Sequence, residues 1–128
     1  IAMSFKIAIV PFHMWTPDVY TGAPTPVTGF LSAAAKAAGF AVFVRILLTG
    51  IPLENANWEN VFWILAVLSM TLGNLMALRQ SEIKRMLAFS SIAHAGYVLV
   101  AIVVGSGSAI SGVIFYSFVY FRLCCYFT

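Results

Sequence analysis

The sequence predicts an all-α polytopic membrane protein with about five transmembrane helices, and three observations support this prediction. Hydrophobic residues make up 62% of the chain and charged residues 9%, whereas a soluble domain is about half apolar and a quarter charged. The mean hydropathy is +0.97. Apolar stretches close to the ~20 residues that cross a bilayer alternate with short connectors rich in turn-forming residues.

The apolar stretches divide the chain into its expected helices. The first contains Pro11 and Pro17, which remove backbone hydrogen bonds and therefore predict a broken helix. No polar linker interrupts the series, so we expect a single transmembrane domain over residues 1–128. The chain starts at Ile1 without a signal-peptide pattern, and we interpret it as an internal fragment of a larger protein. The expected helices cover residues 1–20, 26–49, 59–78, 86–104 and 109–128.

The distribution of charge predicts the orientation of these helices. Three of the seven basic residues lie in the connector 79–85, whereas the connector near Glu54 and Glu59 holds none. By the positive-inside rule, the basic connector faces the cytoplasm and the turn at 21–25 lies on the same side. The net charge of +3 is too small, and too scattered, for a nucleic-acid-binding surface.

Lys36 is expected in the middle of the membrane. It follows the turn at 21–25 by about 11 residues, or roughly 16 Å at ~1.5 Å per residue, in a hydrocarbon core about 30 Å thick. A charge at this depth costs at least ~2.5–3.5 kcal/mol on insertion scales, so it needs local compensation. Thr28 and Ser32 share its helix face, and the surrounding alanines leave room for neighbouring helices or for water.

Lys6 is the second candidate, because it lies about 14 residues before Tyr20 and is also expected near mid-membrane. Pro11 is expected to free the carbonyl of Ile7, beside Lys6. Irregular backbone at membrane depth is tolerated where it lines protein or a water-filled cavity, as in transporters. Desolvation lets a lysine release its proton, which an arginine cannot do, so both lysines are candidates for proton transfer. The alternative is a static ion pair with an acid elsewhere in the assembly.

His94 is a third candidate for proton transfer, because histidine exchanges protons near neutral pH. Ser90, Ser91 and Tyr97 lie one turn away and are expected on the same helix face. A hydrogen-bonded core histidine without a role in transfer explains this pattern equally well.

Other polar residues have simpler explanations. Ser69 and Asn74 are expected to form hydrogen bonds between helices. Tyr116 and Tyr120 share a face at i, i+4, which fits packing as well as a polar path. The two adjacent cysteines lack a metal-binding spacing, and the sequence contains no phosphate-binding loop, dinucleotide fingerprint or paired carboxylates. We therefore predict no metal site and no classical catalytic centre.

Two stretches resemble the proton-conducting membrane transporter family. One is Pro11–Thr28, continuing through the alanines on both sides of Lys36, and the other is Gly73–Leu78 followed by Ile83–Tyr97. Within the family, the sequence Trp-Thr-Pro-Asp-Val-Tyr at residues 15–20 resembles the motif of the subunit-N branch of bacterial proton-pumping NADH:quinone oxidoreductases.

The resemblance covers roughly residues 1–120. Residues 121–128 depart from the family pattern, which we interpret as a frameshift or sequencing error. The resemblance implies an antiporter-like bundle built from inverted repeats, of which this chain would supply the middle part. It also implies that Lys6 is the central site of a proton path and that Lys36 is the lysine connecting this site to the rest of the path. Further charged residues of the path would lie outside this chain.

The function implied is proton translocation through the buried lysines, coupled to electron transfer from NADH to quinone in other subunits. Quinone, FMN and iron–sulfur clusters are expected in those subunits, and no cofactor is expected here. The expected partners are other membrane subunits, protons and the lipid bilayer of the bacterial inner membrane. One alternative is a monovalent cation/proton antiporter subunit of the same superfamily. Another is a purely structural membrane subunit with its lysines in static pairs.

Overall fold

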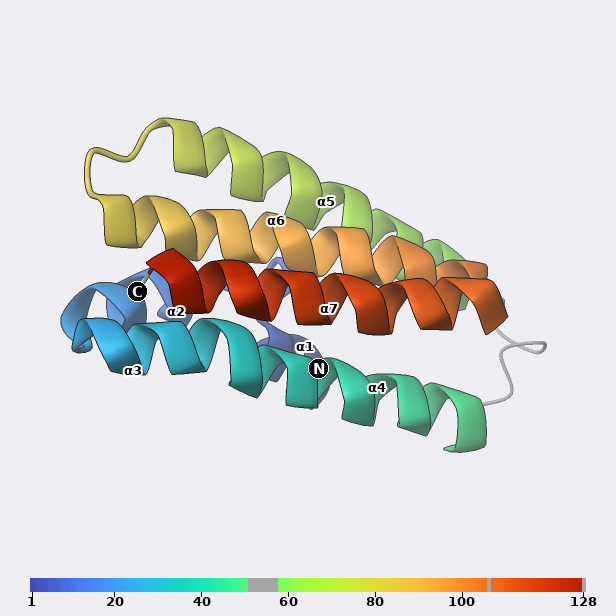
Figure 1. Cartoon of the computed structure of the whole chain (residues 1–128). Helices are drawn as coiled ribbons and strands as arrows, with labels where there is room; N and C mark the ends of the chain where they lie inside the picture. Colours follow the sequence, from blue (N-terminus) through green and yellow to red (C-terminus); the bar gives the residue numbers. More distant parts are fainter. Residues whose placement is uncertain (51–57, 106, 128) are drawn as a thin grey trace.

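The computed structural model describes residues 1–50, 58–105 and 107–127, and every regular element in these ranges is a helix. The long helices lie side by side in one bundle (Figure 1). Within the described residues, four segments are long and apolar enough to cross a membrane, so the predicted all-α polytopic fold is confirmed. These segments are Thr25–Gly50, Trp58–Leu78 (α5), Ile83–Val104 (α6) and Gly107–Cys124, which belongs to α7 (Gly107–Phe127).

The first expected helix is broken, as its prolines predict. It consists of α1 (Ala2–Ile7) and α2 (Trp15–Gly22), separated by a non-helical stretch. The break begins at Ala8, which adopts a left-handed conformation with φ 61° and ψ 49°. This conformation is strained for a residue that carries a Cβ atom.

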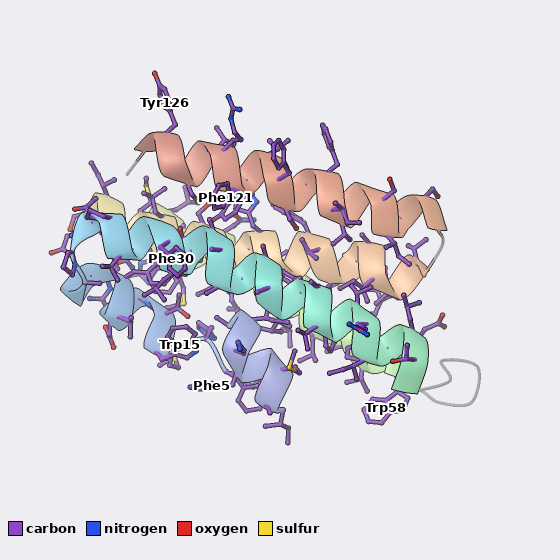
Figure 2. All side chains as sticks on the ribbon, turned by 60° about the horizontal axis from the view of Figure 1, so that its bottom comes forward. Phe5, Trp15, Phe30, Trp58, Phe121 and Tyr126 are labelled. Atoms are coloured by element: carbon purple, nitrogen blue, oxygen red, sulfur yellow. The ribbon has the colours of Figure 1, made fainter. Side chains whose placement is uncertain are left out.

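Side chains hold the two pieces of the broken helix in place. The indole N–H of Trp15 donates to the carbonyl oxygen of Phe5 at 3.0 Å, and the two rings lie 5.7 Å apart (Figure 2). Within the break, the backbone N–H of Val10 donates to Ser69 Oγ on α5 at 3.1 Å. The predicted role of Ser69 in a hydrogen bond between segments is therefore confirmed.

The second membrane-spanning segment contains a change of helix type that the sequence does not predict. It starts as α3 (Thr25–Phe30), widens into a π-helical turn over Leu31–Ala35 (η1) and continues as α4 (Lys36–Gly50). Pro26 lies in the first turn of α3, where its missing N–H costs nothing. The π-helical turn ends immediately before Lys36, near the middle of the span.

α5 and α6 pack against each other over most of their length, and glycine makes this possible. A Cβ atom at Gly73 would lie 2.8 Å from the backbone nitrogen of Ala93, and one at Gly96 would lie 3.0 Å from that of Met70. Asn74 Nδ2 donates to the Tyr97 hydroxyl at 3.3 Å, which confirms the predicted interhelical role of Asn74.

The turn at 21–25 and the connector 79–85 lie at the same end of the bundle, as the charge pattern predicts (Figure 1). Lys84 Nζ donates to the carbonyl oxygen of Ala23 at 3.2 Å. Arg85 Nη2 lies 3.6 Å from Asp18 Oδ1. The connector that contains Glu54 falls outside the described residues.

α7 packs against α6 and η1, while α1 packs against α4. Beyond Tyr120, α7 continues as regular helix to Phe127. Many large apolar side chains on the outside of the bundle are exposed, as expected of surfaces that face lipid.

Candidate functional site

Lys36 is buried in the middle of the bundle, with 6% of its surface exposed. Its Nζ donates to the carbonyl oxygen of Ser91 at 3.0 Å and to Ser91 Oγ at 2.8 Å. Ser91 Oγ in turn donates to the carbonyl oxygen of Ala88 at 2.7 Å. An ammonium group has three N–H donors, so a third donor remains after the two bonds to Ser91.

Among the described residues, no carboxylate forms an ion pair with Lys36. The ion pair that these residues do form joins Asp18 and Arg85. The hydrogen bonds to Ser91 therefore offset part of the cost of burying the charge. Because those partners are neutral, Lys36 is not held in its charged form by a fixed negative charge in this part of the protein. Such a setting suits a group that gains and loses a proton.

The polar stripe that precedes Lys36 is buried too. Thr28 Oγ1 donates to the carbonyl oxygen of Tyr20 at 3.1 Å, and Ser32 Oγ donates to that of Gly29 at 2.9 Å. Thr28 and Ser32 are each 7% exposed. The expected common face of Thr28, Ser32 and Lys36 thus turns inward, and each of the two hydroxyls donates to a backbone carbonyl.

His94 lies in the middle of α6 and is surrounded by aromatic rings. The ring centroids of Tyr97, Tyr116 and Tyr120 are 5.7, 5.8 and 4.8 Å from that of His94. His94 Nδ1 is hydrogen-bonded to the Tyr116 hydroxyl. The choice between packing and a polar path for Tyr116 is therefore decided in favour of a polar contact.

A small cavity joins Lys36 to His94. Its volume is about 20 Å³, close to what one water molecule needs. Ser91, Tyr116 and Tyr120 also line it. A water molecule in this space would have several polar partners, so the cavity suits a hydrogen-bonded link between the two titratable groups.

A second cavity of about 200 Å³ adjoins His94 on the side of the turn at 21–25. Tyr20, Thr28 and Ser32 line it together with His94 and Tyr120. His94 and Tyr120 thus border both cavities, and the polar stripe of the second span borders the larger one. Of the two serines next to His94, Ser91 joins this cluster. Ser90 instead borders a groove between α5 and α6, so the expected common face holds for one serine only.

Lys6 differs from the other predicted site residues, because its side chain is exposed in the described structure. The expectation that Lys6 is buried is therefore wrong for this part of the protein. The physical reason is that α1 turns Ile7, the residue after Lys6, toward the core. Ile7 Cγ1 lies 3.4 Å from where a Cβ atom of Gly39 would be, one turn beyond Lys36.

Two contacts of the site are not predicted by the sequence. Ser91 is the partner of Lys36 across 55 residues of sequence, and Tyr116 is the partner of His94 across 22. The i, i+4 spacing of Tyr116 and Tyr120 was the available signal for the second pair. No group of three or more His, Cys, Asp or Glu side chains in the described part of the chain could hold a metal ion.

Comparison with known proteins gives a family match over nearly the whole chain. Residues 1–127 match the family described as NADH:quinone oxidoreductase/Mrp antiporter, TM. NADH-quinone oxidoreductase subunit N of Trichlorobacter lovleyi is 61% identical over 116 residues, which are 91% of this chain and 24% of that protein. NAD(P)H-quinone oxidoreductase subunit 2 of Nostoc punctiforme is 54% identical over 127 residues, or 98% of this chain and 24% of that protein. The chain thus spans about a quarter of the length of these relatives.

Solved structures show the same fold. A chain of respiratory complex I from Thermus thermophilus, solved with bound aureothin, is 40% identical with a TM-score of 0.77, covering 96% of this chain and 27% of that one. A chain of the Mrp complex from Dietzia sp. DQ12-45-1b is 22% identical with a TM-score of 0.86, covering 96% of this chain and 23% of that one. The second likeness is one of fold alone.

Proposed function

Because the chain belongs to the NADH:quinone oxidoreductase/Mrp antiporter transmembrane family, we propose that it is part of a proton-translocating membrane subunit of an NADH:quinone oxidoreductase. The observation that carries this proposal is the buried lysine in the middle of the bundle. Lys36 has neutral hydrogen-bond partners and shares a water-sized cavity with His94. Intramembrane ionisable groups in such surroundings are typical of proton paths.

The similarity of sequence favours an oxidoreductase subunit over a cation/proton antiporter subunit. Relatives named as NADH-quinone oxidoreductase subunits are 61% and 56% identical, whereas the Mrp chain is 22% identical. The two kinds of protein share the fold, so the fold does not separate them. In the proposed assembly, quinone, FMN and iron–sulfur clusters belong to other subunits, and this chain handles protons only.

In the proposed mechanism, Lys36 takes up a proton when the surroundings favour its charged form and gives it to the hydrated space beside His94 when they do not. His94 then passes the charge toward the second cavity, which is lined by Thr28 and Ser32. Moving one charge against 100 mV costs about 2.3 kcal/mol. A change in the solvation of a buried amine is large enough to supply this energy.

Lys6 has a different place in the proposal. It lies on α1, which packs against α4 beside the turn that carries Lys36. The relatives are about four times as long as this chain, and in the full-length protein we place Lys6 in contact with the remaining helices. There it would exchange protons with Lys36 along the middle of the membrane.

Replacement of Lys36 tests the proposal in the full-length subunit within its assembled complex. We expect Lys36→Met to lower the protons translocated per NADH oxidised by about 10²-fold, the lower range for a lost proton-transfer group. Lys6→Ala is expected to act in the same direction. The measurement is proton uptake by sealed membrane vesicles during NADH oxidation.

The matched control is Arg45→Met, which removes a positive charge from the exposed face of the same helix. We expect it to pump normally. Normal pumping by Lys36→Met in a fully assembled complex would refute the proposal and favour a structural role for the lysine. NADH oxidation without proton uptake in the unchanged complex would refute it as well.

A further inference from the structure

Of the three tyrosine rings around His94, one also holds the imidazole by a hydrogen bond. Tyr116, from α7, is bonded to His94 Nδ1. The Tyr97 hydroxyl accepts the amide N–H of Asn74 at 3.3 Å. Tyr120 stacks closer to His94, with the centroids 4.8 Å apart. Among the described residues, however, no hydrogen bond joins the Tyr120 hydroxyl to the histidine. Tyr116 is thus the tyrosine that can set the state of this ring.

A hydrogen bond at one nitrogen of an imidazole fixes the ring orientation and leaves the other nitrogen to exchange protons. The tautomer that it selects depends on whether the partner accepts from that nitrogen or donates to it, and a tyrosine hydroxyl can do either. With Nδ1 held by Tyr116, Nε2 is the nitrogen left to exchange protons with the cavities that His94 borders. If the tyrosine oxygen accepts the Nδ1–H, Nε2 carries the lone pair and can take up a proton. Without the tyrosine hydroxyl, neither tautomer is selected by this contact.

We infer that Tyr116 is a positioning residue for proton translocation, holding His94 in the tautomer with its proton on Nδ1 so that Nε2 exchanges the transferred proton. The inference rests on the proposed function, since it requires His94 to relay protons. A proton that arrives at Nε2 converts the ring to an imidazolium, which keeps its Nδ1–H bond to the Tyr116 oxygen. Departure of the proton from Nε2 restores the neutral ring, and the tyrosine keeps its own proton throughout.

α7 provides a matched control for this role. Tyr116 and Tyr120 lie one turn apart on the same helix, and both line the small cavity with Lys36 and His94. Replacing either by phenylalanine removes one hydroxyl from the same space and leaves the ring. The two variants differ in whether the lost hydroxyl was bonded to His94.

The test compares Tyr116→Phe, Tyr120→Phe, His94→Gln and the double variant Tyr116→Phe/His94→Gln in the assembled complex. The readout is the rate of proton uptake by sealed vesicles per NADH oxidised, followed across the pH range in which histidine titrates. We expect Tyr116→Phe to lower this rate by about two- to tenfold, the range for one ordinary hydrogen bond, and to shift its pH dependence. Tyr120→Phe should shift the pH dependence less than Tyr116→Phe does, because it leaves the hydrogen bond at His94 Nδ1 in place.

In the His94→Gln background, adding Tyr116→Phe should cause no further loss, because residues that act through one contact are not additive. A full additional loss in the double variant would overturn the inference, and so would a normal pH dependence in Tyr116→Phe or normal pumping by His94→Gln. Lys36→Met in the same series separates the two proposals. If Lys36→Met fails to pump while Tyr116→Phe is normal, only the role of Tyr116 is lost.

The tautomer can also be measured directly, without relying on pumping. The ¹⁵N chemical shifts of the His94 ring in the unchanged complex, assigned by their loss in His94→Gln, should show a protonated Nδ1 and an unprotonated Nε2. The opposite tautomer would overturn the inference whatever the variants do.

Discussion

Lys36 and Lys6 lie on neighbouring helices, but the protein surrounds them differently. Lys36 is 6% exposed and donates two hydrogen bonds to one residue of α6. Lys6 has an exposed side chain at the end of the short helix α1. The two are linked through Ile7, which follows Lys6 and packs beside Gly39, one turn beyond Lys36.

This difference shows that the helices of this chain surround the side chain of Lys36. For Lys6, they fix the position of the backbone but leave the side chain uncovered. The break after Lys6 is held by Trp15 and by Ser69, so the position of α1 is well defined even though its lysine is uncovered. A buried charge needs partners within hydrogen-bonding distance. Lys36 finds them inside this chain, and we expect Lys6 to find them in the rest of the full-length subunit.

Arginine at each position gives the largest expected contrast between the two regions. Lys36→Arg places a larger, permanently charged group in a packed site, and we expect it to destabilise the subunit by about 3 kcal/mol, at the top of the range for overpacking. Lys6→Arg should cost no more than about 0.5 kcal/mol if its surroundings are open. The measurement is the amount of assembled complex on native gels after graded heating. Equal losses for both variants would show that Lys6 is as tightly packed as Lys36 in the full-length protein.

The fold and the location of Lys36 could be predicted because they depend on local properties of the sequence. Span length, apolar composition and the distance of Lys36 from a turn give its depth directly. The four-residue spacing of Thr28, Ser32 and Lys36 gives a common face, and all three residues are buried. Pro11 and Pro17 predict the broken helix, although the break begins at Ala8.

The partners within the site could not be predicted, because they depend on how separate helices pack. Ser91 and Ser90 are equally plausible neighbours by spacing, and the rotation of α6 against α4 selects Ser91. The bond between Tyr116 and His94 depends likewise on the placement of α7. The π-helical turn before Lys36 has no sequence signal that we recognise. The exposure of Lys6 reflects which surfaces this part of the protein covers.

Gly73 tests whether the setting of Lys36 depends on the placement of α6. A Cβ atom there would lie 2.8 Å from the backbone nitrogen of Ala93, next to His94, so Gly73→Ala should push α6 away from α5. We expect a loss of about 1–2 kcal/mol in stability together with reduced pumping. Gly112→Ala is the control, since its Cβ atom would have no described atom from outside the adjacent helix backbone within 4 Å. Unchanged stability of Gly73→Ala would mean that α5 and α6 are less closely packed in the membrane.

The smallest expected effect concerns the ion pair that joins α2, the second piece of the broken helix, to α6 at one end of the bundle. Asp18 on α2 lies 3.6 Å from Arg85 at the start of α6, and its side chain is 75% exposed. Exposed pairs contribute about 0–1 kcal/mol, because water and salt screen them. Asp18→Asn should therefore lower the thermal stability of the complex only slightly, and less at high salt, whereas Asp18→Glu keeps the charge and should match the unchanged protein. If Asp18→Asn lowers thermal stability more than Gly73→Ala does, the ion pair contributes far more to the packing of α2 against α6 than an exposed pair should.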